Sequence, residues 1–447
     1  MYFIFGQQLY STREILLQYL KGEATASLDE IVDLALRNNP ATRVAWFQAR
    51  ASAADLGSKR AAYFPEIDLD ANLTRQKTAA VGGRFTYLQT TYGPSASLNY
   101  LLFNFGGREA DTDEARQALF AANWTHDAAI QNLVLQVEQA YYQYLDAKAL
   151  AASAQASFQQ AEENLAAAEE RHRAGVATIA DVLQAKTARS QAQLALTAAR
   201  GLIQTYRGAL ATAVGVSPDI PVEVGELPEI ANLEEVGQSV DALIATARSE
   251  RPDLAAAWFE AQKAESHVRS VRAEGLPSLS AAGTIGRTYY YNPVGAAYSN
   301  NYSGAILFRF PLFMGFQNRY DTLKAQEEAS AARAQVDTLS NLVIFQVWSS
   351  YYGVQTATQQ VRTARDLLAS AQQSQEVALA RYKAGVGSIL DLLTAQSALA
   401  SARAEEVLAR ATWFLALAQL AHDTGALTPP AGAPGPPPVS KGQRDSE

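Results

Sequence analysis

Two aspartates have the clearest positions for chemistry in this sequence, because each follows a hydroxyl residue by three positions. Asp181 follows Thr178, and Asp391 follows Ser388. Such spacing is typical of a helix N-terminus, where the carboxylate bonds to backbone amides and gains about 0.3 to 1 kcal/mol from the helix dipole. Simple capping is therefore one interpretation of both residues, and it stays open beside any functional one.

The rest of the chain offers little for catalysis. Gly82 and Gly83 indicate only a loop, not a phosphate-binding motif. The chain has no cysteine, and its histidines occur singly, without metal-ligand spacing, as His126, His172, His267 and His422. We therefore expect no enzyme, no catalytic residue, no metal and no cofactor.

Composition excludes further classes of protein. The 447 residues are 48% hydrophobic and 18% charged, as in a folded chain, and the net charge of −8 argues against a nucleic-acid partner. No run of 18 or more apolar residues occurs, so no helix is predicted to cross a membrane. A bilayer, if this protein crosses one, must be met by strands.

The elements that position the aspartates belong to a sequence unit that occurs twice in the chain. Arg171, Gly175 and Asp181 return as Arg381, Gly385 and Asp391, at an offset of 210 residues. In each unit we expect a helix, two strands, a long helix, a tight turn and a returning helix. This order predicts two tandem repeats, over residues 27–236 and 237–427.

The two ends of the chain lie outside these repeats. Residues 1–26 stay unassigned, because they lack a basic start and a cleavage site and do not resemble an intact signal peptide. A misplaced start, an expression scar and a protein that is not exported all remain open. Residues 428–447 are rich in proline and are expected to form a disordered tail.

Periodicity predicts the individual elements. A first helix should begin at Ser27, capped with Glu30, and run towards Tyr63. After Pro65 the apolar residues alternate, which predicts a strand with one apolar face, paired to a second around residues 95–102. The second repeat should supply counterparts around 279–289 and 303–313.

A long helix is predicted from about Gly107 to Arg173, with a seven-residue repeat in its seam. Small residues recur along one side of that seam, which indicates a coiled coil with closely packed backbones. Gly175 and Gly385 mark the two hairpin turns, where a left-handed backbone favours glycine.

The order and duplication of these motifs resemble the TolC-like outer-membrane efflux protein family over roughly Ser27 to Thr424. The residues that carry the resemblance are the opening Leu28, Ala35, Leu36, Asn39 and Pro40, the strand exit Leu102, Phe103, Gly106, Gly107 and Arg108, and the hairpin tip Arg171, Ala174, Gly175, Asp181 and Leu183. It implies a mixed α and β membrane protein: a homotrimeric 12-stranded β-barrel continued by a long α-helical coiled-coil tunnel.

The resemblance also implies location and partners. The barrel would lie in the lipid of the cell outer membrane and the tunnel in the periplasm, where an adaptor protein and an inner-membrane pump would engage it. The implied function is a passive channel of a tripartite efflux or type I secretion system, gated at its periplasmic tip. A physical argument that does not depend on the resemblance also favours association of several copies, because four strands cannot close a membrane barrel by themselves.

The resemblance assigns roles to named residues. A periplasmic gate is implied at Asp391, Asp181, Arg381, Tyr382 and Arg171. Adaptor contacts are implied at the hairpin tips, Gly175, Val176, Gly385 and Val386. Tyrosines near the strand ends suggest a membrane-interface girdle, formed by Tyr87, Tyr92, Tyr289, Tyr290, Tyr291, Tyr298 and Tyr302.

Each role has a plainer alternative. The aspartates could only cap their helices, and the arginines could only interact with the helix dipole at a C-terminus. The tips could be ordinary turns, and some of the tyrosines could lie in loops without a role in the membrane. Some relatives carry a second acidic ring, which Gln184 and Thr394 replace here. The alternative from another class is a periplasmic coiled-coil adaptor or interaction protein. The exported substrate, the class of pump and the resting state, open or closed, are not predicted.

Overall fold

The computed structural model describes residues 27–80, 85–220, 222–230, 233, 237–291 and 297–427, and the chain divides into two compact units. The hairpin unit holds Met1–Ala45, His126–Pro252 and Ser340–Glu447; the sheet unit holds Trp46–Thr125 and Asp253–Leu339. The expectations for residues 1–26 and 428–447 lie outside the described residues.

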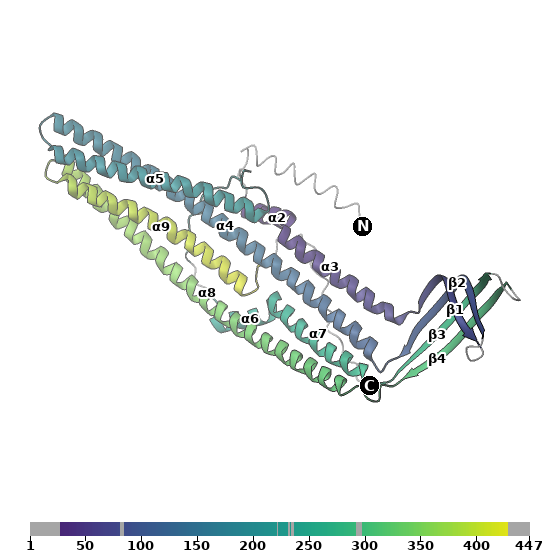
Figure 1. The fold of residues 1–447 in the computed structure, drawn as a ribbon. Helices are drawn as coiled ribbons and strands as arrows, with labels where there is room; N and C mark the ends of the chain where they lie inside the picture. Colours follow the sequence, from purple (N-terminus) through teal and green to yellow (C-terminus); the bar gives the residue numbers. More distant parts are fainter. Residues whose placement is uncertain are drawn as a thin grey trace. The chain divides into compact units, whose positions relative to one another are not determined.

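The element order is duplicated along the chain (Figure 1). The first series is α2 (Leu28–Asn38), α3 (Pro40–Arg60), η1 (Ala61–Tyr63), β1 (Glu66–Ala80), β2 (Phe85–Phe103), α4 (Gly107–Arg173) and α5 (Ile179–Val214). The second is α6 (Val240–Glu250), α7 (Pro252–Glu274), β3 (Ser278–Tyr291), β4 (Tyr298–Arg309), α8 (Gln317–Lys383) and α9 (Ile389–Asp423).

The first helix is divided, contrary to the expectation of one helix from Ser27 towards Tyr63. Ser27 does cap α2 with Glu30, but Asn39 is extended, with φ −65° and ψ 128°, and α3 begins at Pro40. The residue before a proline avoids the helical region, which explains the break. The Asn39 side chain stabilises it by accepting from the Ala41 amide at 2.8 Å and donating to the Ala213 carbonyl at 2.9 Å.

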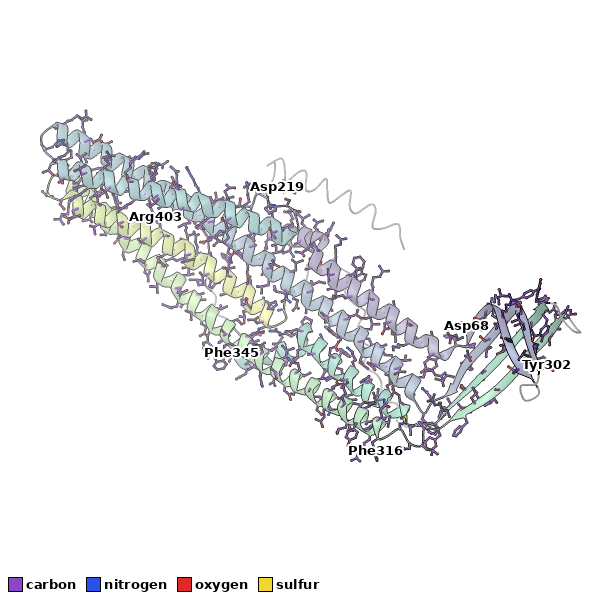
Figure 2. The ribbon with its side chains drawn as sticks, in the orientation of Figure 1. Asp68, Asp219, Tyr302, Phe316, Phe345 and Arg403 are labelled. Carbon is purple, nitrogen blue, oxygen red and sulfur yellow. The ribbon has the colours of Figure 1, made fainter. Side chains whose placement is uncertain are left out.

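The sheet has the antiparallel order β1-β2-β3-β4, so the hairpins of the two repeats lie side by side. Opposed residues in such a ladder share a face. One face is apolar and exposed, with members such as Leu69 at 85% and Ile306 at 72%. The opposite face is polar and holds residues such as Asp68, labelled in Figure 2, and Ser97, which pair with each other. β4 ends at Arg309, short of the predicted 313, while β1 runs beyond its alternating segment to Ala80.

The hairpin unit is built from two long helical hairpins. Figure 1 shows α5 beside α4 and α9 beside α8, and the predicted seam residues are buried, for example Val137 at 0% and Ala168 at 0% exposure. The main core also includes Ile31 of α2 and Leu210 of α5. Among the described residues, no helix combines the length and the apolar character needed to cross a membrane.

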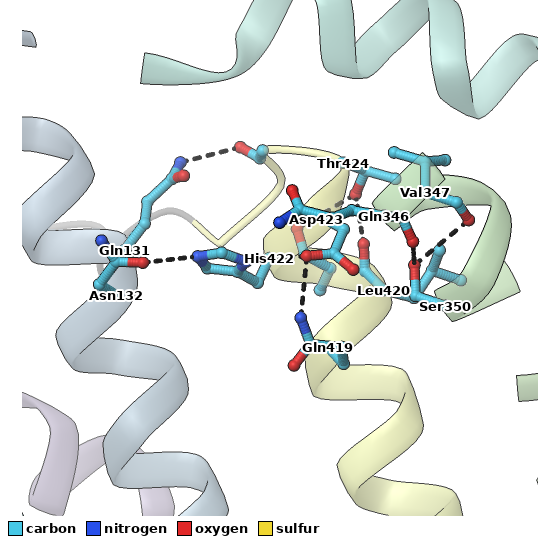
Figure 3. Close-up of polar contacts among 12 residues, drawn as sticks. Gln131, Asn132, Gln346, Val347, Ser350, Gln419, Leu420, His422, Asp423 and Thr424 are labelled. Atoms are coloured by element: carbon cyan, nitrogen blue, oxygen red, sulfur yellow. Dashed lines mark hydrogen bonds and ion pairs between the residues drawn. The ribbon is translucent and has the colours of Figure 1, made fainter. Parts of the chain in front are cut away.

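Polar contacts hold the C-terminal end of α9 in the hairpin unit (Figure 3). His422 contacts the Asn132 amide oxygen of α4 at 2.9 Å, and Gln131 donates to the Gly425 carbonyl at 3.1 Å. On the other side, the buried Arg251 donates both to the Gln346 side chain of α8 at 2.7 Å and to the carbonyl of Asp423, the last residue of α9, at 3.3 Å. These bonds tie the end of α9 to both long helices.

Candidate functional site

The two hairpin turns have the same geometry. Gly175 and Gly385 adopt φ of +75° and +76°. In the first turn the Val176 amide donates to the Arg171 carbonyl at 2.9 Å, and in the second the Val386 amide donates to the Arg381 carbonyl at 3.0 Å. An added Cβ at either glycine would meet nothing within 4 Å, so the left-handed backbone, not space, explains glycine here.

Both aspartates cap the helix that follows the turn. The Asp181 carboxylate accepts from the Thr178 amide at 2.7 Å and from its hydroxyl at 2.8 Å. Asp391 is held more loosely, because it accepts from the Ser388 amide at 3.4 Å and its side chain is exposed. Capping is therefore present at both sites, and it leaves the Asp391 carboxylate more open to further interactions than that of Asp181.

The structure brings two of the predicted gate residues together. Arg171, near the end of α4, donates from Nη1 to the Tyr382 carbonyl of α8 at 2.9 Å, and its guanidinium carbon lies 4.6 Å from the centroid of that tyrosine ring. Tyr382 is buried, at 8% exposure, in a cluster with Ile389, Leu392 and Ala168. Arg171 therefore links the first hairpin to the second.

The linked pair keeps unused hydrogen-bonding capacity. The Arg171 Nε and the Tyr382 hydroxyl are both buried, and neither has a hydrogen-bond partner among the described residues. Arg381 differs from them, because its side chain is exposed. At the turns, Val176 and Val386 are exposed at 66% and 70%, so an apolar side chain projects from each tip.

Sequence reasoning missed a second polar link between the hairpins. Asn164 of α4 donates to the Gln396 side-chain oxygen of α9 at 2.7 Å, beside a groove of about 590 Å³ formed by α4, α5 and α9. Amide and hydroxyl side chains recur along this groove, including Gln160, Gln184, Thr187, Gln191 and Ser397. The sequence feature that could have indicated this polar link is the recurrence of glutamine within the alanine-rich helices.

The predicted tyrosine girdle divides between the two faces of the sheet. Tyr92 pairs with Tyr289, and their rings stack at 5.3 Å between centroids; Tyr289 in turn pairs with Tyr298. By strand alternation, Tyr291 and Tyr302 share this apolar face. Tyr87 and Tyr290 have the opposite parity and lie on the polar face.

Two neighbouring ionisable side chains of α4, Glu138 and Tyr142, have raised pKa values. Burial, followed by the nearby Asp29 carboxylate, raises the pKa of Glu138. Burial also raises the pKa of Tyr142 to about 12, with smaller contributions from Glu138 and Tyr141. Neither group lies in a site suited to catalysis, and the described residues hold no cluster of three or more metal-ligating side chains.

Comparison with known proteins identifies the family. The family model described as outer membrane efflux protein matches residues 31–216 and 243–426. Protein CyaE of Bordetella pertussis is 30% identical over 410 residues, covering 90% of this chain and 85% of CyaE. The outer membrane efflux protein BepC of Brucella suis is 25% identical over 411 residues, covering 92% of this chain and 88% of BepC.

Solved structures share the fold. The Campylobacter jejuni CmeC outer membrane channel superposes with a TM-score of 0.80 at 20% identity, over 89% of this chain and 85% of CmeC. The chain thus belongs to the outer membrane efflux protein family and has a TolC-like fold of helices and strands. It is an outer-membrane channel and not an enzyme, which confirms the function class that the sequence predicted.

Proposed function

We propose that three copies of this chain form a passive conduit across the outer membrane. Each copy contributes four strands to one 12-stranded barrel, and the helical hairpins continue it as a tunnel in the periplasm. One observation carries the proposal: within the part of the chain that the structure describes, β1 and β4 are edges without a pairing strand, and the sheet exposes a face of residues such as Leu69 and Ile306. Unpaired edges are costly in lipid, and edges shared between copies remove that cost.

The two faces of the sheet suit such a barrel. The apolar face would meet the acyl chains, with Tyr92, Tyr289 and Tyr298 near its rim as part of a girdle, while the polar face would line the pore. Tyr87 and Tyr290, on the polar face, would then line the pore near its mouth. We propose repeat boundaries at 27–236 and 237–427, supported by the duplicated element order.

An image of the detergent-solubilised particle tests this assembly. We expect a three-fold tube, and a protein that needs detergent to stay in solution. A single copy that remains soluble without detergent would contradict the proposal and would favour the periplasmic adaptor instead. The channel would carry solutes or polypeptides from an inner-membrane pump and its adaptor, which supply the energy.

The periplasmic gate would lie at the hairpin turns. The Arg171–Tyr382 link holds the two hairpins of one copy together, and Asp391 presents an exposed carboxylate near the second turn. When adaptor hairpins engage, the second hairpin would swing outward and relax a ring of three Asp391 carboxylates. Asp181 and Arg381 would contribute charge to the same entrance.

Single-channel conductance in planar bilayers tests the gate. Asp391→Asn keeps an oxygen for capping but removes the charge, so we expect a larger conductance and weaker cation preference. Ser388→Ala is the matched control, because it weakens the same cap and leaves the carboxylate. If Asp391→Asn conducts no better than the wild type, Asp391 is not part of the gate.

The exposed hairpin tips would contact the adaptor. Val176 and Val386 offer apolar side chains next to glycine turns that present their backbones without a side chain. Val386→Lys should reduce co-purification of the adaptor, whereas Lys383→Ala, a charge change close to the same turn, serves as the control. Equal recovery of adaptor with Val386→Lys would exclude this contact.

A further inference from the structure

The apolar face of the sheet becomes basic towards the strand ends that lie away from the helices. Arg75 and Lys77 follow Leu69 on β1 at even spacing, so they share its face, and both side chains are exposed. Arg287 of β3 lies two residues before Tyr289, which puts it on the same face, and it is exposed as well. We call Arg75, Lys77 and Arg287 the cationic belt.

No acidic residue of the strands neutralises this belt. The three carboxylates of the four strands belong to the polar face, close to the helices, and are Glu66, Asp68 and Asp70. The segments that join the strand ends near the belt, 81–84 and 292–296, contain no Asp or Glu in their sequence. The strands have one further basic residue, Arg309, which lies on the polar face at the far end of β4, opposite Ser278.

Arg287 is held in a position that suits an anion. Its Nε donates to the Asn300 side-chain oxygen of β4 at 2.8 Å, and its guanidinium carbon lies 4.8 Å from the centroid of the Tyr298 ring. These two contacts fix the plane of the guanidinium and leave its two Nη groups without a hydrogen-bond partner among the described residues. Two N–H groups in this fixed geometry match two oxygens of a phosphate group.

The strand order spreads the basic residues around the proposed barrel. The belt residues lie on β1 and β3, which are separated by β2, and β4 would separate β3 from β1 of the next copy. Since neighbouring strands are about 4.8 Å apart, a basic strand would recur about every 10 Å around the barrel. Arg75 and Arg287 each lie two residues, about 7 Å, from the level of the Tyr92–Tyr289 pair. The cations therefore form a belt beside the tyrosines.

This belt lies at the level expected for lipid headgroups. Tyr92, Tyr289 and Tyr298 form one row across three strands, and tyrosines of membrane barrels gather at the interface between headgroups and acyl chains. A lipid-facing Arg or Lys is tolerated at this level but not at the middle of the bilayer. With the tunnel in the periplasm, these strand ends would face the outer leaflet, because the opposite ends lead into the helices.

We infer that the cationic belt binds the phosphate groups of lipids in the outer leaflet. A lipid fits this surface better than a free anion, because exposed apolar side chains adjoin the belt on the same face. Leu73 and Ile285 are 75% and 67% exposed, and each lies two residues from a belt arginine, where it would contact the acyl chains. This inference rests on the proposed barrel and adds the ligand of its outer rim.

Native mass spectrometry of the full-length, detergent-solubilised protein tests the belt by counting bound lipids. The probe is lipid A, a glycolipid with two phosphates, and the matched probe is the same glycolipid without its phosphates. An Arg75→Gln, Lys77→Gln, Arg287→Gln variant should bind lipid A roughly tenfold or more weakly than the wild type, because its charged contacts to phosphate are lost. Arg309→Gln is the control, because it removes the same charge from the polar face and should leave binding unchanged.

A second variant separates geometry from charge. Arg287→Lys keeps the positive charge but loses the planar pair of donors, so lipid A should bind more weakly than to the wild type and more tightly than to the triple variant. The mass of the particle in the same spectra shows whether each variant is still assembled.

The outcomes separate this inference from the proposed function. Equal binding of lipid A by the wild type and an assembled triple variant, or equal binding of the two glycolipids by the wild type, would overturn the belt and leave the trimeric barrel intact. Displacement of lipid A by an equal concentration of inorganic phosphate would overturn the assignment to a lipid, because the acyl chains would then add nothing. A wild-type protein that is monomeric in these spectra would overturn the proposed function itself.

Discussion

The ring of Tyr142 on α4 lies parallel to that of Phe414 on α9, with centroids 4.9 Å apart and an angle of 4° between the planes. This stack joins the long helix of one repeat to the returning helix of the other, and such pairs contribute about 0.5 to 1.5 kcal/mol beyond burial. It is one of several contacts that join the two halves of the hairpin unit side by side. Glu138, one turn before Tyr142, is half-buried in the same region.

Glu138→Gln should stabilise the protein at neutral pH. Burial and Asp29 raise the pKa of this carboxyl, so the folded state binds its proton more tightly than the unfolded state does. The wild type therefore loses stability as the pH rises from the ordinary glutamate pKa, about 4.3, through the raised one. The gain in the variant should therefore be larger at pH 7 than at pH 4, where the carboxyl is largely protonated in both states.

Chemical denaturation of the detergent-solubilised protein at pH 7 and pH 4 measures this difference. Glu163→Gln is the control, because that carboxylate is exposed on the same helix and its replacement should change the free energy of unfolding by less than about 0.5 kcal/mol. A gain from Glu138→Gln that is equal at both pH values would contradict the electrostatic explanation.

Substitution of Arg171 should change channel opening, whereas removal of the Tyr382 hydroxyl should not. Arg171→Ala removes the bond to the Tyr382 carbonyl and the contact with its ring, and charged hydrogen bonds contribute about 1.5 to 3 kcal/mol. We expect more frequent or longer openings in planar bilayers. Tyr382→Phe keeps both contacts and removes only a buried hydroxyl without a described partner, so its conductance should match the wild type. Equal behaviour of the two variants would exclude the link from gating.

The sequence predicted the elements better than the contacts between them. The helix from Gly107 to Arg173 was placed at both ends, because its heptads and the following glycine are local signals. The break at Asn39 was missed although Pro40 marks it, because the capping pattern at Ser27 favoured one continuous helix. The resemblance placed Arg171 and Tyr382 in one gate, but their contact was not predicted, since the two residues lie 211 positions apart.

The register of the strands decides on which face of the sheet each tyrosine lies, and it could not be read from the sequence. The seven tyrosines were grouped by their place near the strand ends, which says nothing about the face on which each one lies. Once the pairing of Tyr92 with Tyr289 is known, alternation alone places Tyr290 on the other face. Hydrophobic alternation is strong in β1 but weaker in β3, so the second pair of strands could be located only approximately from sequence.

Glycine at the hairpin turns should be required for its backbone conformation. Gly385→Ala puts a Cβ on a residue with φ of +76°, which costs about 1 to 2 kcal/mol, although no atom lies within 4 Å of the added group. Gly57→Ala, inside α3 and equally open, should instead stabilise by about 0.5 to 1 kcal/mol. Denaturation midpoints of the two variants should therefore move in opposite directions; a rise for both would mean that the turn tolerates alanine.

The two faces of β1 should tolerate charge unequally. Leu69 is 85% exposed on the apolar face, and its neighbour Asp70 lies on the polar face, opposite Ser95. A lysine that faces lipid near the middle of the bilayer costs about 2 to 4 kcal/mol, whereas a lysine that faces a water-filled pore costs little. Leu69→Lys should therefore reduce insertion into lipid vesicles severely, and Asp70→Lys should insert like the wild type with altered ion preference. Because the substitutions are adjacent and introduce the same side chain, equal insertion of both would show that this face of the sheet does not contact lipid.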